Sequence, residues 1–288
     1  MRNVQQIYRA NSQHWVGNGF LVQPLFSHMD EDRGSDPFLM LDYAAPKDFP
    51  ADGLERGVGA HPHKGFETVT IAYQGEVEHR DSTGGGGVIG TGDVQWMTAG
   101  NGIIHQEFHS EHFSRNGGTF EMVQLWVNLP AKHKSAPARY QHLAKENIPV
   151  IALPAQAGTI RLIAGKYQNT QGAAETFTEM NVWDMDLHAT QQAELSIPVS
   201  HNLLLVVLRG EIRINGEQNA RAGELVRFEQ QGETFTLQAG TENAKILLLS
   251  GVPINEPVAA YGPFVMNTET EIMQAIDDFR SGRFGAIA

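Results

Sequence analysis

The sequence predicts an all-β protein built from two antiparallel β-barrels, and three observations lead to this expectation. The chain has 288 residues, which exceeds the usual size of one domain and suits two. Its 30 glycines and 13 prolines indicate many turns. Short strand patterns separated by glycine turns occur in the first half and again in the second. We therefore expect two domains, at residues 1–135 and 136–288.

The strand patterns are short and bounded by turn residues. In the first half, apolar or alternating segments fall at 68–73, 76–80, 88–90, 93–97 and 122–128. In the second half they fall at 203–208 and 209–214, and the Asn215-Gly216 pair that follows is typical of a tight hairpin. The segment 130–154 has little period-two alternation, so we expect it to connect the two halves.

The glycines reveal an internal repeat. Residues 74–77 (Gln-Gly-Glu-Val) match residues 209–212 (Arg-Gly-Glu-Ile), and 92–94 (Gly-Asp-Val) match 223–225 (Gly-Glu-Leu). The two glycines lie 17 residues apart in the first copy and 13 in the second, and the difference is about the length of a glycine-rich turn at 84–87. Two copies of one barrel are the simplest explanation.

A single amphipathic helix is predicted near the end of the chain. Residues 268–271 (Thr-Glu-Thr-Glu) have the form of a capping box, which satisfies free backbone N–H groups at a helix start. Ile272, Ile276 and Phe279 then share one face at helical spacing, and Gly282 is expected to end the helix. We expect this helix to cover a sheet.

Composition excludes several kinds of function. The net charge of −12 argues against binding of bare nucleic acid or anionic membrane through a broad basic surface. The absence of cysteine excludes disulfides, thiolate metal sites and thiol nucleophiles. We see neither a secretory signal in the first residues nor an apolar run long enough to span a membrane. A cytoplasmic, monomeric protein is expected.

Two short pairs of potential metal ligands dominate the first half. His61 and His63 are two residues apart, as are His105 and Glu107. Because side chains on a β-strand alternate between faces, both members of each pair point the same way. Two neighbouring strands can thus aim three imidazoles and one carboxylate at a single metal ion. These four donors would leave open coordination positions, which a catalytic site needs.

Other histidines lack such a pattern. His109 continues the alternation after Glu107, and we expect it to lie beyond the metal site. His14, His79 and His112 have no evident partner, so we interpret them as ordinary surface or half-buried histidines.

The second half offers no equivalent set of ligands. The four metal-site residues of the first half lie at fixed distances from the repeated glycines. At the same distances in the second half, the sequence has residues that are not suited to bind a metal there: Ser196, Pro198, Thr236 and Gln238. We therefore expect the second barrel to lack metal ligands.

The motifs around these residues resemble the pirin family of the cupin superfamily. The similar stretches cover nearly the whole chain, at 61–70, 75–82, 92–105, 124–130 and 262–268. The resemblance implies a bicupin with two jelly-roll barrels and one mononuclear metal in the first. It also implies that the ligands are His61, His63, His105 and Glu107. Glu67, which many other cupins would use as a ligand, is then a supporting residue.

The resemblance further implies an activity. Several pirins resemble quercetin 2,3-dioxygenases, which open the central ring of a flavonol with O2 and release carbon monoxide. Glu107 would then act as the catalytic base toward the flavonol hydroxyl, and the metal is expected to be Fe2+, with Mn, Ni, Co or Cu as alternatives. Phe66, Trp96 and Met97 either line the substrate cavity or belong to the barrel core.

The sequence is also compatible with two other functions. Eukaryotic pirins are linked to transcription factors, so a metal- or redox-responsive regulatory protein without turnover is one alternative. A metal enzyme that acts on a different small substrate is the other.

Overall fold

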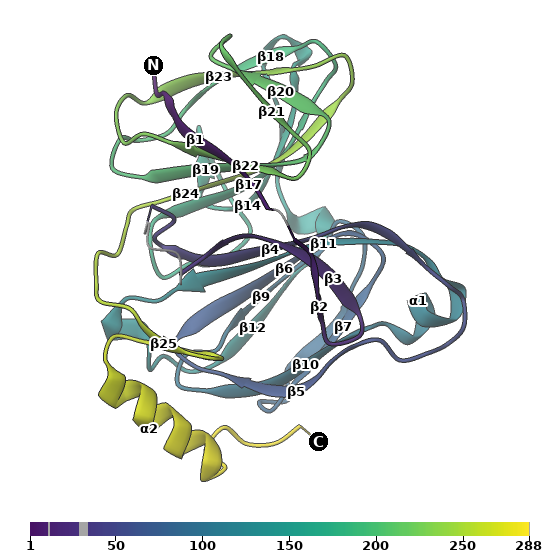
Figure 1. Ribbon diagram of the computed structural model, residues 1–288, viewed down its shortest axis with the longest axis vertical. Coiled ribbons are helices and arrows are strands. Elements are labelled where there is room, and N and C mark those ends of the chain that lie inside the picture. Colours follow the sequence, from purple (N-terminus) through teal and green to yellow (C-terminus); the bar gives the residue numbers. More distant parts are fainter. Residues whose placement is uncertain (11, 29–33, 288) are drawn as a thin grey trace. The chain divides into compact units, whose positions relative to one another are not determined.

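The computed structural model describes residues 1–10, 12–28 and 34–287. Within those residues β-strands dominate, and the two α-helices are short: α1 (Glu111–Asn116) and α2 (Glu269–Arg280). The pairings within the sheets are antiparallel. The all-β, two-barrel prediction is therefore confirmed (Figure 1). No helix of the described part of the chain is long and apolar enough to cross a membrane.

The chain forms two compact units, and each is built around one barrel. The first barrel belongs to a unit of Ser12–Ser27, Phe38–Lys145 and Ile254–Ala288. The second barrel belongs to a unit of Met1–Asn11, His28–Pro37 and Glu146–Pro253. The units are therefore not the contiguous segments 1–135 and 136–288 expected from the sequence. Instead, the N-terminal residues contribute to the second unit and the C-terminal residues to the first.

The first barrel consists of a seven-stranded and a four-stranded sheet. The larger sheet has the order β12 (Arg139–Leu143), β9 (Val94–Thr98), β6 (Phe66–Gln74), β11 (Gly118–Asn128), β4 (Phe38–Phe49), β3 (Phe20–Ser27) and β2 (His14–Val16). The smaller sheet has the order β5 (Gly57–His63), β10 (Ile103–His109), β7 (Val77–Asp81) and β8 (Gly86–Ile89). A separate pair, β25 (Ala259–Tyr261) and β26 (Phe264–Met266), belongs to the same unit.

The second barrel repeats this architecture. Its larger sheet has the order β1 (Val4–Arg9), β22 (Glu224–Phe228), β19 (Asn202–Arg209), β24 (Ala244–Gly251), β17 (Met180–Leu187), β14 (Gly158–Ala164) and β13 (Val150–Ala152). Its smaller sheet has the order β18 (Gln192–Ser196), β23 (Thr234–Ala239), β20 (Glu211–Ile214) and β21 (Gln218–Arg221). A short hairpin joins β15 (Lys166–Tyr167) to β16 (Thr170–Gln171). Single 3-10 turns fall at Ala131–His133, Lys145–Asn147 and Pro154–Gln156.

Backbone conformation explains why the repeated glycines are glycines. Gly75 and Gly210 have φ angles of 81° and 75°, and Gly92 and Gly223 have φ angles of 93° and 82°. Side chains with a Cβ rarely adopt such angles, so both copies need glycine at both turns. The predicted hairpin at Asn215-Gly216 is also present, since Ile214 pairs with Gln218 across it.

One edge strand of each larger sheet comes from a connecting or terminal segment. Strand β12, from the segment predicted to be a simple connection, adds to β9 in the first barrel. Strand β1 adds to β22 in the second. Few side chains of these short strands are fully buried, so apolar and polar residues do not alternate clearly in them, and sequence periodicity did not separate them from loops.

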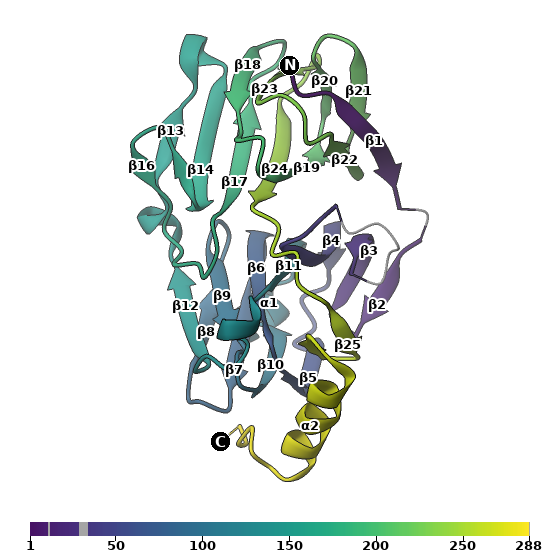
Figure 2. The ribbon, with the colours of Figure 1, turned by 90° about the vertical axis from the view of Figure 1, so that its left-hand side faces the viewer.

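Helix α2 begins as predicted and packs against the first barrel's C-terminal hairpin. Both hydrogen bonds of the Thr268/Glu271 capping box are present. Ile272 is 7% exposed and packs in a cluster with Phe264 and Met266, whereas Phe279 is 38% exposed. Figure 2 shows α2 beside β25 and near β5. Asp278 of the helix pairs with Lys64, so the helix is also linked to the residue that follows the first histidine pair.

Candidate metal centre

The two ligand pairs lie on neighbouring antiparallel strands, β5 and β10. His61 is directly opposite His105, and His63 is opposite Ile103. The register shifts after His105, so that Glu107 pairs with Val58 through an irregularity in β5. Because the side-chain period of a strand is two, His105 and Glu107 share a face of β10.

The structure brings His61, His63 and His105 together. One potential ligand atom from each lies within 4.8 Å of the other two. The ring centroids are 4.3 Å apart for His61 and His105, 4.8 Å for His63 and His105, and 4.9 Å for His61 and His63. His63 and His105 are buried, while His61 is half-buried, so the cluster is most accessible from the side of His61.

Each of these imidazoles has its Nδ1 engaged, which leaves Nε2 for a metal. Nδ1 of His61 lies 2.8 Å from the Gly59 carbonyl oxygen, and Nδ1 of His63 lies 3.4 Å from the Pro263 carbonyl oxygen. Nδ1 of His105 lies 3.3 Å from a ring nitrogen of His79. Nε2 of His105 is buried and has no hydrogen-bond partner. A buried ring nitrogen without a partner, beside two other imidazoles, is what a metal site requires.

Burial keeps the imidazoles of His63 and His105 neutral. Desolvation, with a contribution from nearby His61, lowers the pKa of His63 to about 3. Desolvation also lowers the pKa of His105 well below its usual value, and the neighbouring histidines contribute. Neutral rings have the lone pair that metal coordination needs.

Glu107 lies next to this cluster but is held by other residues. The structure groups its carboxylate with His79 and His105, and not with His61 and His63. Its Oε1 accepts a hydrogen bond of 3.1 Å from Thr70 Oγ1 and a short one from Gln95 Nε2. Gln95 in turn accepts a hydrogen bond of 3.2 Å from the Tyr140 hydroxyl. The structure therefore brings three of the four predicted ligands together, and the fourth, Glu107, lies close to one of them, His105.

Sequence reasoning missed the residues that support these ligands. His79, interpreted as an ordinary histidine, is 0% exposed and lies between His105 and Asp81. The missed signal was its spacing, because His79 and Asp81 are two residues apart on β7, like the ligand pairs themselves. Across the ladder, Asp81 is opposite His105 and His79 is opposite Glu107.

Phe66, Trp96 and Met97, which the sequence places either along the substrate cavity or in the barrel core, are buried. Phe66 packs against Leu39 and Val265, with its ring 5.1 Å from that of His63. Met97 belongs to a small apolar cluster, and Trp96 is 0% exposed.

Glu67 and His109 are also held away from the three-imidazole cluster. Glu67 is 0% exposed and accepts a hydrogen bond from Thr98, as expected of a supporting residue. His109 contacts the Gly19 carbonyl and the ring of Phe120.

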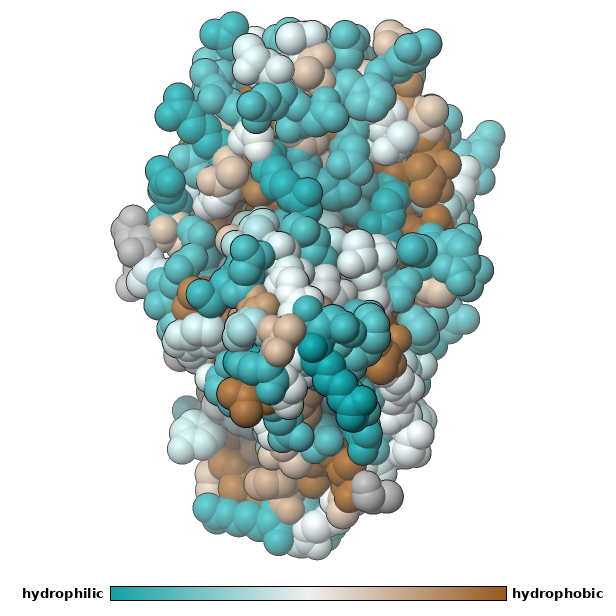
Figure 3. All heavy atoms as spheres, turned by 90° about the vertical axis from the view of Figure 1, so that its right-hand side faces the viewer, coloured by the Kyte–Doolittle hydropathy of each residue, from teal (hydrophilic) through white to brown (hydrophobic). Residues whose placement is uncertain are grey.

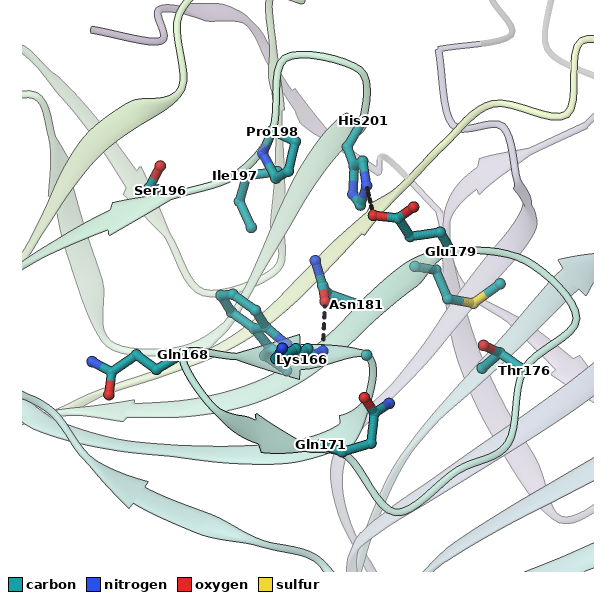
Figure 4. A pocket seen from close by; sticks show the side chains of 13 residues that line it. Lys166, Gln168, Gln171, Thr176, Glu179, Asn181, Ser196, Ile197, Pro198 and His201 are labelled. Carbon is teal, nitrogen blue, oxygen red and sulfur yellow. Dashed lines mark hydrogen bonds and ion pairs between the residues drawn. The ribbon is translucent and has the colours of Figure 1, made fainter.

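The second barrel has a cavity at the counterpart of the first histidine pair. Ser196 and Pro198, which match His61 and His63 by spacing, line a cavity of about 490 Å³ (Figure 4). His201, also in this cavity, lies 3.3 Å from the Glu179 carboxylate and 3.3 Å from Ser250 Oγ. Both candidate metal clusters found among the described residues lie in the first barrel instead.

The surface is mainly polar on the face drawn in Figure 3. Hydrophilic residues dominate there and hydrophobic ones form separate patches.

Comparison with known proteins gives matches along most of the chain. Residues 19–127 match the family model described as Pirin, and residues 182–285 match the model of the Pirin C-terminal cupin domain. A crystal structure of quercetin 2,3-dioxygenase from Acinetobacter baumannii is 51% identical, with full coverage of both chains and a TM-score of 0.96.

Two further relatives extend the comparison. A Pseudomonas aeruginosa protein, provisionally named quercetin 2,3-dioxygenase, is 51% identical over 99% of each chain. The bacterial pirin YhhW from Escherichia coli, solved in complex with nickel(II), shares the fold at 21% identity and a TM-score of 0.64, covering 86% of this chain and 100% of that one.

Proposed function

Because the chain belongs to the pirin family of cupin proteins, we propose that it is a metal-dependent dioxygenase that cleaves the central ring of a flavonol such as quercetin. The observation that carries this proposal is the cluster of three imidazoles, one with a buried and unpartnered Nε2, beside the Glu107 carboxylate. The 51% identity to a protein solved as a quercetin 2,3-dioxygenase supports the same substrate class.

His61, His63, His105 and Glu107 would hold one divalent metal. Three nitrogen donors and one oxygen donor suit Fe2+, and they also suit Mn, Ni, Co and Cu. We propose Fe2+ as the resident ion. When bound, the metal would lower the energy of the flavonol oxyanion and bring the substrate and O2 together.

Glu107 would take the proton of the flavonol 3-hydroxyl. The hydrogen bonds from Thr70 and Gln95 both reach Oε1, so Oε2 is the oxygen that would face the metal and that would receive the proton when the substrate oxygen takes its place. A carboxylate held in this way is positioned for general base catalysis. The side chains buried behind it, Thr70 and Gln95, would keep its orientation constant while the proton moves.

Turnover of quercetin in air tests the proposed dioxygenase activity. Protein purified without added metal is analysed for its elements, then mixed with quercetin, and the loss of flavonol absorbance is followed together with carbon monoxide release. We expect turnover in the wild type and a loss of at least about 100-fold in Glu107→Gln. His105→Ala should lose both metal and activity.

Either of two results would contradict the dioxygenase proposal. One is unchanged turnover in both variants. The other is a metal-loaded wild-type protein that leaves quercetin intact, which would favour a metal- or redox-responsive regulatory role. We also propose that the protein acts as a cytoplasmic monomer without nucleic-acid partners, and size-exclusion chromatography with light scattering tests its oligomeric state.

A further inference from the structure

A chain of three buried side chains begins at the proposed metal site with His105 and ends at Asp81. Nδ1 of His105 lies 3.3 Å from Nδ1 of His79. Nε2 of His79 lies 3.2 Å from Oδ2 of Asp81. His79 and His105 are 0% exposed, and Asp81 is 4% exposed. Both ring nitrogens of His79 are therefore occupied, which leaves neither for a metal ion.

The Asp81 carboxylate determines which nitrogens carry protons along this chain. Oδ1 of Asp81 already accepts hydrogen bonds from the Thr83 backbone N–H, the Thr83 hydroxyl and the Gly85 backbone N–H, an arrangement that favours the ionised carboxylate, so Asp81 accepts from His79. Nε2 of a neutral His79 must then carry the proton and donate it to Asp81. Its Nδ1 must accept, so Nδ1 of His105 must donate. The proton of His105 is thereby placed on Nδ1, and its Nε2 keeps a lone pair.

The surroundings keep Asp81 and His79 in place. The other oxygen of Asp81, Oδ1, accepts hydrogen bonds from the Thr83 backbone N–H at 2.8 Å, the Thr83 hydroxyl at 2.6 Å and the Gly85 backbone N–H at 3.0 Å. A Cβ at Gly85 would come within 2.5 Å of Oδ2, so a larger residue there would displace the carboxylate. The Tyr140 ring stacks on His79 at a centroid distance of 4.8 Å.

We propose that Asp81 and His79 are positioning residues that fix the tautomer of His105 and aim its Nε2 lone pair at the metal. This inference rests on the proposed metal site. Such carboxylate–histidine–metal chains typically change metal affinity by about 10–100-fold when they are broken.

The test compares metal affinity in matched variants. Asp81→Asn keeps the shape but can present an amide N–H to His79 Nε2, which would reverse both tautomers and put a proton on His105 Nε2. His79→Gln removes the imidazole that links Asp81 to His105. The control is His201→Gln, because His201 is also buried and lies beside a carboxylate but belongs to the second barrel.

Nickel(II) is the probe, and its dissociation constant is measured by isothermal titration calorimetry. We expect the first two variants to bind about 10–100-fold more weakly than the wild type and the control to match the wild type. Copper(II)-loaded samples should also show altered nitrogen hyperfine coupling in their electron paramagnetic resonance spectra.

The outcomes separate the two proposals. Nickel affinity within twofold of wild type in both Asp81→Asn and His79→Gln would overturn the positioning role while leaving the metal site intact. A wild type that binds no nickel would overturn the metal site itself.

A measurement on the wild type covers the case in which the variants fail to fold. The nitrogen-15 shifts of the imidazoles in the apo protein report the His105 tautomer directly. A protonated Nε2 on His105 would refute the inference.

Discussion

Lys64 Nζ lies 2.8 Å from Asp278 Oδ2 and so ties the residue after His63 to the C-terminal helix. Both side chains are largely buried, with exposed fractions of 6% and 11%. Next to this ion pair, the Pro263 carbonyl faces His63 Nδ1, and the Val265 backbone N–H donates to the Lys64 carbonyl. The last part of the chain is thus a structural support of β5, which carries two of the proposed metal ligands.

The ion pair should contribute measurably to stability. Asp278→Asn leaves the Lys64 ammonium buried without its counter-charge, so we expect the free energy of unfolding to fall by about 3 kcal/mol. Urea denaturation measures the change. Asp277→Asn is the matched control, because that neighbouring side chain is exposed. Equal losses in the two variants would contradict this role of Asp278.

Lys134 anchors the same C-terminal segment. Its Nζ donates to the Gly65 carbonyl, the Asn128 side-chain oxygen and the Val265 carbonyl at 2.8–2.9 Å, although burial lowers its pKa to about 8. Lys134→Met would leave three buried acceptors unpaired, and we expect a loss of about 2–4 kcal/mol in the free energy of unfolding.

Thermal and urea unfolding of Lys134→Met measure this loss. The exposed Lys132→Met serves as the comparison and should unfold like the wild type. A Lys134→Met protein as stable as the wild type would show that the three hydrogen bonds contribute nothing net.

Glu67 should make stability depend on pH. Burial raises its pKa to about 7 from the usual 4.5, so the folded state favours the protonated form. Its stabilising contribution is complete below about pH 4.5 and is lost as the pH rises through 7. Glu67→Gln stays neutral throughout, so its stability relative to the wild type should increase across this range, by up to about 3 kcal/mol.

Unfolding free energies at pH 5 and pH 8 test the Glu67 prediction. Glu217→Gln, at an exposed position, should show no such difference between the two pH values. A stability difference between Glu67→Gln and wild type that stays constant with pH would mean that Glu67 remains ionised in the folded protein.

Gln95 should control the orientation of Glu107, the proposed catalytic base. Its amide donates to Glu107 Oε1 and to Thr70 Oγ1, so Gln95→Leu would release the carboxylate. We expect kcat for quercetin to fall by about 10–100-fold, because a misplaced base loses its alignment with the substrate hydroxyl. Steady-state kinetics of the metal-loaded protein measure the fall.

The neighbouring strand position provides the control for Gln95. Gln106→Leu changes a half-buried residue on the other face of β10 and should keep nearly full activity. Wild-type turnover in Gln95→Leu would show that Glu107 needs no such support.

Local sequence patterns predicted much of the fold because the physics behind them is local. Helix α2 follows from a capping box and an apolar face within a few residues of each other. The repeated glycines mark turns whose φ angles exclude other residues. The i, i+2 spacing of His61 and His63 follows from strand geometry alone. His79 and Asp81, which sequence reasoning missed, have the same spacing, so the sequence also contained the pattern that could have identified them.

By itself, the sequence determined the strand-rich class, the doubled barrel and the capped helix, and it predicted the residues that we propose as metal ligands. Only the tertiary structure decided that β1 joins the second barrel, that residues 254–288 brace the first, and that Glu107 is held by Thr70 and Gln95 beside the three imidazoles. These relationships join residues far apart along the chain. Their free energy comes from burial and hydrogen bonds that exist only after the strands have paired, so no local pattern of residues encodes them.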